Sequence, residues 1–231
     1  MTTLFDLPTS PSVPVLGESN GFPVRRIFCV GRNYADHARE MGAEPDREAP
    51  FYFTKSPWAV CPSGATIAYP PGTANCHYEM ELVVAISAPA FRIAQADALS
   101  AVFGYACGFD MTRRDLQNAA KDKGRPWDLG KDFENAAVMA PITRAEAFGI
   151  VEAQVIRLTQ NGTVKQDSVL SDMIFSVPEL IADLSKFYHL APGDLIYTGT
   201  PAGVEPIAAG DVLVGTIDGL TPVELTIGAP E

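Results

Sequence analysis

The sequence predicts a β-rich domain of the α+β class. Many short apolar runs are separated by turn residues, and the chain contains 19 glycines and 19 prolines. Few segments have helical periodicity, and these do not alternate regularly with strands, so repeating βαβ units are not expected. With 231 residues, 47% of them hydrophobic, the chain can bury a substantial core.

An N-terminal arm is expected to precede the folded domain. Residues 1–24 are rich in Pro, Ser and Thr and have no periodicity of helix or strand. We expect this arm to pack loosely or to lie over a neighbouring subunit, and residues 25–231 to form the domain itself.

The first half of the domain is predicted to contain strands with short helices between them. A helix over residues 34–41 has Asn33 as its expected N-cap and Gly42 as its C-terminal stop. This helix is short and polar, so we expect it to be weakly anchored. The expected elements are a strand over 26–30, this helix, strands over 51–55 and 78–87, a helical segment over 96–103 and a strand that ends near Asp110.

The second half is predicted to contain two helices and two hairpins. Asn161-Gly162 is a strong signal for a two-residue β-turn, and Asp218-Gly219 is a similar one. The expected elements are a helix over 113–123 capped by Thr112 and stopped by Gly124, strands over 153–159 and 163–169, a helix from Pro178 to about residue 188, and strands over 195–198, 212–217 and 221–227.

Composition excludes several classes of function. The formal net charge is −11 and the longest basic cluster is the pair Arg113-Arg114, so a nucleic-acid partner is not expected. No apolar stretch is long enough to span a membrane, and residues 1–15 lack the pattern of a signal peptide. The four cysteines are scattered, which is typical of reduced thiols, so we expect a cytoplasmic protein.

Three acidic residues suggest a metal site. Glu79 and Glu81 are two apart beside an apolar run, so in a strand both carboxylates point to one face, and Asp110 ends a second apolar run. The pair alone is more typical of an edge strand with one solvated face. Together with Asp110, it favours an all-carboxylate shell for a hard ion, Mg²⁺ or Mn²⁺, with Ca²⁺ as a further candidate.

A histidine and a glutamate on the first helix form a candidate general base. His37 and Glu40 are three apart, so they share a helix face. A carboxylate beside an imidazole fixes its tautomer and raises its basicity, which suits activation of water. Exposed helices also carry such pairs for solubility alone.

Other polar residues are candidates for binding an anion. Lys55 and Lys131 lie in sequence that otherwise looks buried, where each could bind an anionic substrate or a metal-ligating carboxylate, or extend to the surface. Arg114 and Gln117 share a face of the next helix, and Arg114 could bind a substrate carboxylate. Thr200, in a Gly-Thr-Pro turn, offers a hydroxyl at a strand end, although turn formation is the usual meaning of this motif.

Six longer motifs cover most of residues 25–220. They are GRNYADHAREMG, FYFTKSP, HYEMELVVAI, GYACGFDMTRRDLQ, GRPWDLGKDF and LIYTGTPAGV. In these motifs and their order, the chain resembles the short, single-domain branch of the fumarylacetoacetate hydrolase (FAH) family. The chain lacks the extra N-terminal domain of the longer fumarylacetoacetases, which makes that particular activity unexpected.

The resemblance implies a fold, an assembly and a set of site residues. The implied fold is a β-sandwich roll of mixed sheets with a few short helices, and the implied assembly is a homodimer. The family's metal ligands fall on Glu79, Glu81 and Asp110, and its catalytic residues fall on His37 and Glu40, in a lid helix that orders when ligand binds, and on Lys131. Its substrate contacts fall on Lys55, Arg114, Gln117 and Thr200.

The resemblance also implies a reaction, the metal-dependent hydrolysis of a carbon–carbon bond in a 1,3-diketo acid. Within the family, the motifs are most similar to bacterial enzymes that cleave fumarylpyruvate to fumarate and pyruvate in gentisate breakdown. Acylpyruvase, oxaloacetate decarboxylase and 2-hydroxydienoate isomerase activities are the alternatives within the family. A catalytically silent protein that binds a metal and an oxo acid is the alternative outside enzymes, but binding alone needs no base such as the His37–Glu40 pair.

Overall fold

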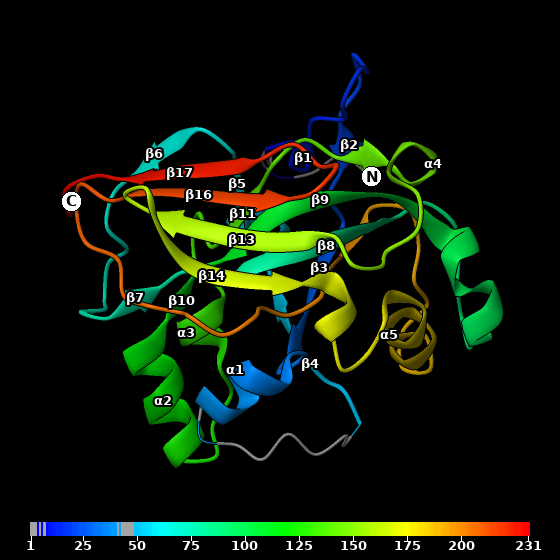
Figure 1. Ribbon diagram of the computed structural model, residues 1–231. Coiled ribbons are helices and arrows are strands. Elements are labelled where there is room, and N and C mark those ends of the chain that lie inside the picture. Colours follow the sequence, from blue (N-terminus) through cyan, green and yellow to red (C-terminus); the bar gives the residue numbers. More distant parts are fainter. Residues whose placement is uncertain (1–3, 5, 7, 41, 43–48) are drawn as a thin grey trace.

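Two β-sheets packed face to face form the centre of the protein (Figure 1). The structure is a computed structural model that describes residues 4, 6, 8–40, 42 and 49–231. The larger sheet is mixed, and β8 lies near its middle. Its strands, in spatial order, are β4 (Phe51–Lys55), β3 (Arg26–Gly31), β15 (Asp194–Tyr197), β8 (Met80–Ile86), β9 (Val102–Asp110), β11 (Ala137–Met139) and β5 (Val60–Pro62), with β12 (Thr143–Arg144) paired to β9.

The smaller sheet is also mixed. Its strands, in spatial order, are β14 (Thr163–Val169), β13 (Val155–Gln160), β16 (Val212–Ile217), β17 (Val223–Ile227) and β6 (Ala65–Ile67). Gly215 of β16 faces Met80 and Phe109 of the larger sheet, where any side chain would collide with both. The missing side chain therefore lets the two sheets approach closely at the strands that carry the acidic residues.

Short elements complete the fold. The helices are α1 (Ala35–Glu40), α2 (Arg114–Asp122), α3 (Asp128–Lys131), α4 (Ala145–Phe148) and α5 (Val177–Leu184), with 3₁₀ helices η1 (Pro57–Ala59), η2 (Gln95–Ala101) and η3 (Leu170–Asp172). Two short strand pairs join β1 (Ser12–Val13) to β2 (Phe22–Pro23) and β7 (Cys76–His77) to β10 (Thr112–Arg113). Helices α1, α2 and α3 lie together at one end of the sheets (Figure 1).

The predicted β-rich α+β class is confirmed, and several elements match closely. Every residue of β8 is buried, as expected for a central strand whose two faces are covered. The hairpin between β13 and β14 turns at Asn161 and Gly162, whose φ angles of 53° and 78° are those of a type I′ turn. The α5 helix begins with a capping box in which Ser176 and Glu179 bond to each other's backbone, but it ends at Leu184 rather than near residue 188.

Two predicted helix caps are wrong because tertiary contacts use the residues differently, and two other elements differ from the prediction at their ends. The strand expected over 78–87 is β8, which begins at Met80, so Glu79 lies just before it. The segment predicted to be helical over 96–103 is the 3₁₀ helix η2, and β9 begins at Val102, two residues earlier than expected. Thr112 lies in β10 and does not cap α2, whose N-cap is Arg113. Asn33 does not cap α1, because its side-chain amide bonds to the backbone of Phe175 and Thr198. Residue 41, the expected end of that helix, lies outside the described residues.

The segment before residue 25 packs more closely than expected. Val13, Val15, Phe22 and Val24 are buried in the same core as the sheets, and the backbone of Ile142 bonds to both Pro14 and Leu16. These contacts make residues 13–24 part of the packed structure. Residues 1–3, 5 and 7 of the predicted arm lie outside the described residues, and the division at residue 24 stays a prediction.

Candidate active site

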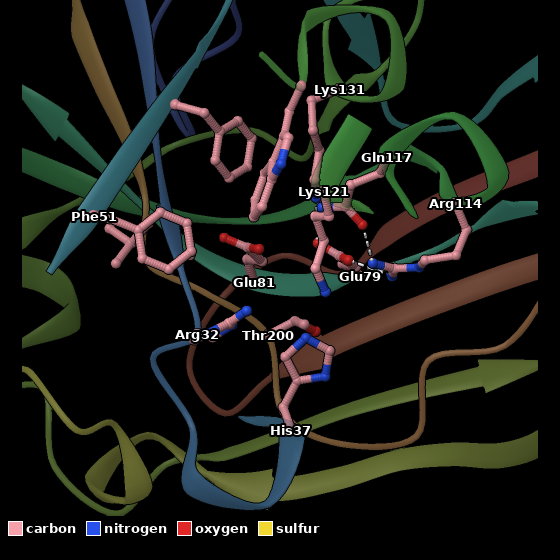
Figure 2. Close-up of a pocket in the computed structure, with 14 residues that line it drawn as sticks. Arg32, His37, Phe51, Glu79, Glu81, Arg114, Gln117, Lys121, Lys131 and Thr200 are labelled. Atoms are coloured by element: carbon pink, nitrogen blue, oxygen red, sulfur yellow. Dashed lines mark hydrogen bonds and ion pairs between the residues drawn. The ribbon is translucent and has the colours of Figure 1, made fainter. Parts of the chain in front are cut away.

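A pocket opens where β8 begins and β9 ends, beside α1, α2 and α3 (Figure 2). Seven of the ten predicted site residues line it or point into it: His37, Glu79, Glu81, Arg114, Gln117, Lys131 and Thr200. Of the others, Asp110 lies beside Glu79 at the end of β9, Glu40 holds His37, and Lys55 lies behind Asp110. The structure therefore brings together residues that are up to 163 positions apart in the sequence.

The three acidic residues converge at the base of this pocket. The backbone N–H of Asp110 donates to the carbonyl of Glu79 at 2.9 Å, which places these two residues side by side at the end of the β8–β9 ladder. Glu79, Glu81 and Asp110 are 5%, 1% and 1% exposed, and each offers a carboxylate oxygen within 4.8 Å of the others. Three carboxylates so close and so deeply buried require positive charge.

Side chains of the protein supply part of this charge. The Lys131 ammonium donates to Glu79 at 2.7 Å, to Asp110 at 2.8 Å and to the Thr112 hydroxyl at 2.7 Å. The Arg114 guanidinium pairs with the other oxygen of Glu79 and donates to Gln117 at 2.6 Å. These contacts explain why Lys131 and Arg114, two cations, are only 2% and 4% exposed.

Lys55 also serves this cluster and not the pocket surface. Its ammonium lies 2.8 Å from Asp110 and donates to the carbonyls of Met111 and Lys131. It is 3% exposed and is not among the residues that line the pocket. Of the three roles expected for this lysine, its position favours holding an acidic residue over contacting a substrate or extending to the surface.

The acidic residues differ in how far their charge is compensated. Burial would raise the pKa of Glu79, but Lys131 and Arg114 outweigh it and lower that pKa below its ordinary range. Burial raises the pKa of Glu81, and Asp110 and Glu79 raise it further, while the charge of Lys131 and the backbone N–H of Gly199, 2.7 Å away, oppose this. Among the described residues, lysines and arginines form ion pairs with Glu79 and Asp110 but not with Glu81. A divalent cation bound by the three carboxylates would add positive charge beside Glu81, and their oxygen donors fit a hard ion.

His37 faces the pocket from α1, and Glu40 holds its ring. The His37 Nδ1 lies 3.1 Å from a Glu40 oxygen, and the N–H of Gly203 donates to both oxygens of Glu40 at 3.1 and 3.3 Å. Burial opposes ionisation of Glu40, but the bonds from His37 and Gly203 lower its pKa. An ionised carboxylate only accepts hydrogen bonds, so the proton of the neutral His37 ring lies on Nδ1. The other ring nitrogen, Nε2, can then accept a proton. That the helix orders on ligand binding stays a prediction.

Gln166 connects parts of the site that sequence reasoning did not link. It is fully buried in β14. Its amide nitrogen donates to the Thr200 hydroxyl at 2.8 Å and to the Pro201 carbonyl at 2.7 Å, while its oxygen accepts from the N–H of Met80 at 3.0 Å. One glutamine in a polar hairpin strand gives no sequence signal for such a role.

Comparisons with known proteins agree with this site. Residues 26–228 match the family described as fumarylacetoacetate (FAA) hydrolase C-terminal. A fumarylpyruvate hydrolase of Ralstonia sp. is 52% identical over 193 residues, which are 83% of this chain and 100% of that protein. An oxaloacetate tautomerase of Escherichia coli (strain K12) is 38% identical over 199 residues, 86% of this chain and 90% of that one.

A solved structure is similar over nearly the whole chain. It is a fumarylpyruvate hydrolase from Pseudomonas aeruginosa in complex with Mn²⁺ and pyruvate, and it is 44% identical, with a TM-score of 0.96 and coverage of 99% of this chain and 100% of that one. The chain belongs to the fumarylacetoacetate hydrolase family. The predicted FAH-type roll is confirmed, as is an enzyme of the class that hydrolyses carbon–carbon bonds in ketonic substances.

A coarser prediction, on the cofactor, is also supported. The acidic triad and the Mn²⁺ in the Pseudomonas structure together support a divalent metal as the cofactor. Within the described residues, no helix has the length and apolar character needed to cross a membrane.

Proposed function

We propose that this protein is a metal-dependent hydrolase that cleaves fumarylpyruvate, a 1,3-diketo acid, to fumarate and pyruvate. The observation that carries the proposal is that a His–Glu pair and a buried acidic triad belong to one pocket. A binding protein would need the triad but no general base. The 52% identity to a fumarylpyruvate hydrolase supports the choice of substrate.

Glu79, Glu81 and Asp110 are proposed to hold the ion, with Mg²⁺ or Mn²⁺ preferred and Ca²⁺ as a further candidate. When bound, the metal supplies a Lewis acid for the 2-oxo acid end of the substrate. Lys55 and Lys131 fix the orientation of Asp110, and Lys131 and Arg114 fix that of Glu79. Lys131 also keeps a fixed positive charge beside the reacting end of the substrate.

His37 is proposed as the general base for water. Its Nε2 accepts a proton from water while Glu40, itself held by Gly203, stabilises the resulting imidazolium. The hydroxide attacks the acyl carbonyl and ends in the new carboxylate of fumarate. The electron pair of the broken carbon–carbon bond leaves on the methylene of the pyruvate fragment, which takes up a proton. One water is consumed for each substrate.

The remaining pocket residues are proposed to bind and orient the substrate. Arg114 and Gln117 lie on one face of α2 and share a hydrogen bond, so together they offer a rigid donor group. The Thr200 hydroxyl, whose position Gln166 fixes, faces the same pocket. We further propose that the protein acts as a homodimer in the cytoplasm.

Tautomerisation of oxaloacetate is the second candidate function. The Escherichia coli relative carries that name, and the same base could move a proton on a 2-oxo acid without adding water. Decarboxylation of oxaloacetate and isomerisation of a 2-hydroxydienoate would use the same site. Unlike hydrolysis, none of these three reactions forms a new carboxylate that contains an oxygen atom from water.

Pyruvate release from three substrates separates these functions. Protein loaded with Mg²⁺ should release pyruvate from fumarylpyruvate faster than from acetylpyruvate, and EDTA should stop the reaction. Release of pyruvate from oxaloacetate alone would indicate the decarboxylase. Enol–keto conversion of oxaloacetate, with no pyruvate released from any of the three, would overturn the proposal in favour of the tautomerase.

A further inference from the structure

Two cations in the pocket lack a carboxylate partner. Arg32 and Lys121 line the same pocket as the acidic triad, and their side chains point into it beside His37 and Thr200 (Figure 2). Along the part of the chain that the structure describes, neither forms an ion pair or a side-chain hydrogen bond. By contrast, Lys55, Arg114 and Lys131 each contact an acidic residue of the triad.

Arg32 has an unusual backbone conformation and lies beside an aromatic ring of the pocket wall. Arg32 has a φ of 58°, which residues other than glycine rarely adopt. The ring of Phe51 packs directly against the Gly31 backbone, where any side chain would collide with it. The Arg32 guanidinium lies 5.7 Å from the centroid of that same ring. Arg32 is exposed, and the Phe51 ring is its side-chain contact in the described part of the pocket wall.

Lys121 is placed by α2 near like charges. It lies seven residues after Arg114, so both side chains project from one face of the helix into the pocket. Burial lowers the pKa of Lys121, and the charges of Arg32 and Arg114 lower it further, while the neighbouring Asp122 opposes them. The protein as a whole carries a net charge of −11, so the positive charge of these two residues is opposite in sign to the molecule as a whole. A bound anion would relieve their repulsion.

An aromatic wall lies next to this pair. Phe51, Phe53 and Trp127 line the pocket. The rings of Phe51 and Trp127 are 5.5 Å apart and nearly perpendicular, at 86°. Such a wall offers flat apolar contact to a planar, conjugated chain and has no acceptor that would hydrogen-bond to a hydroxylated one.

We propose that Arg32 and Lys121 bind a second carboxylate, at the acyl end of the substrate, while the aromatic wall contacts the planar chain between the two ends. This inference rests on the proposed function and narrows its substrate class. The site would select diketo acids whose acyl group is flat, unsaturated and ends in a carboxylate over those whose acyl group is neutral.

The test compares two substrates that differ at the acyl end. Fumarylpyruvate carries the second carboxylate and acetylpyruvate does not. Arg32→Gln and Lys121→Gln should each lower kcat/KM for fumarylpyruvate about tenfold, mainly through KM, because each removes one charged hydrogen-bond donor. For acetylpyruvate both variants should stay within about twofold of the wild type, the range expected when no contact is lost.

Lys123→Gln is the matched control. Lys123 is exposed near the end of the same helix and does not line the pocket. The Lys123→Gln variant removes one positive charge, as the two test variants do, so any effect of net charge alone would appear in it too. Equal losses on both substrates, or no loss on either, would overturn the proposal.

A binding measurement separates this proposal from the proposed reaction. If the wild type cleaves neither diketo acid, the proposed function fails, and fumarate is then titrated into protein saturated with Mg²⁺ and oxalate. Weaker fumarate binding in Arg32→Gln and Lys121→Gln than in Lys123→Gln, with oxalate affinity unchanged, would still support a carboxylate site. Equal fumarate affinity in all four proteins would overturn it.

Discussion

Among the described residues, the pocket has paired charges at its inner end, around the acidic triad, and unpaired cations at its outer end, at Arg32 and Lys121. At the inner end, Lys131 alone contacts two acidic residues of the triad and a hydroxyl. At the outer end, Arg32 and Lys121 contact no carboxylate of the described chain. The two ends lie in one pocket (Figure 2).

The difference suggests that the inner residues stabilise the folded protein and that the outer residues serve to bind a ligand. A buried ion pair is costly to break, so the inner charges should affect stability as well as the proposed metal binding. Partly exposed, unpaired cations contribute little to folding, but they gain interaction energy when an anion binds. Variants at the two ends should therefore have separable effects on stability and on substrate preference.

The largest effect is expected from Glu81. Its carboxylate is bonded by one backbone N–H and is the least compensated of the triad, so Glu81→Ala should remove a metal ligand with little other loss. Activity should be abolished, and Mg²⁺ or Mn²⁺ affinity measured by calorimetry should fall sharply. Glu224→Ala, at an exposed position on β17, is the control. Full turnover by metal-free wild-type protein would contradict the metal requirement.

His37 should affect chemistry without affecting binding. His37→Ala is expected to lower kcat on fumarylpyruvate by ~10²- to 10⁴-fold, the usual contribution of a positioned general base. Its affinities for Mg²⁺ and for oxalate should stay near those of the wild type, because His37 is outside the triad. Steady-state kinetics and calorimetry provide the two readouts. Unchanged hydrolysis would mean that water is activated by another group.

Stability should distinguish Lys131 from Lys121. Lys131→Met leaves Glu79 and Asp110 with unpaired charge, so the free energy of unfolding without metal should fall by about 3–5 kcal/mol. The midpoint of thermal unfolding should then drop by roughly 10 °C in a chain of this size. Saturating Mg²⁺ should recover part of this loss. Lys121→Gln should change the midpoint by no more than about 2 °C, and equal losses in both variants would remove the distinction between the two ends.

Glu40 should give a small pH-dependent effect on stability. Its pKa in the folded protein lies below its ordinary value, which is about 4.3 in an unfolded chain. Its contribution is therefore fully present above about pH 4.3 and is lost as the pH falls through the lower, folded pKa. Because the side chain is 33% exposed, we expect Glu40→Gln to cost only about 0.5 kcal/mol at neutral pH.

Denaturant unfolding at several pH values would check the Glu40 prediction. The difference between the wild type and Glu40→Gln should shrink as the pH falls below about 4. A difference that stays constant down to low pH would mean that the charge of Glu40 contributes nothing to stability.

Patterns local in sequence predicted two of the pairs in the candidate site. The alternation expected along a strand predicted Glu79 and Glu81 close together, which they are although Glu79 precedes β8, and helical spacing predicted His37 beside Glu40. The same reasoning could have included Lys121, since residues 114, 117 and 121 follow the i, i+3, i+7 pattern of one helix face.

Residues that serve distant segments could not be predicted in this way. Asn33 and Thr112 have the sequence context of helix caps, but their side chains bond to loops and to a lysine elsewhere in the chain. Gln166 joins the start of β8 to the Thr200 turn only because two sheets pack together. Tertiary hydrogen bonds of this kind override local propensity and leave no periodic pattern in the sequence.

Hydrolysis in water labelled with ¹⁸O is the most direct test of the proposed reaction. Fumarylpyruvate should be converted by the Mg²⁺-loaded protein, and one ¹⁸O atom should appear in a carboxylate of each fumarate, where it does not exchange with solvent. Mass spectrometry of the fumarate gives the answer, with His37→Ala as the slow control. Fumarate with one label would agree with attack of water on the acyl carbon. Consumption of fumarylpyruvate without labelled fumarate would contradict it.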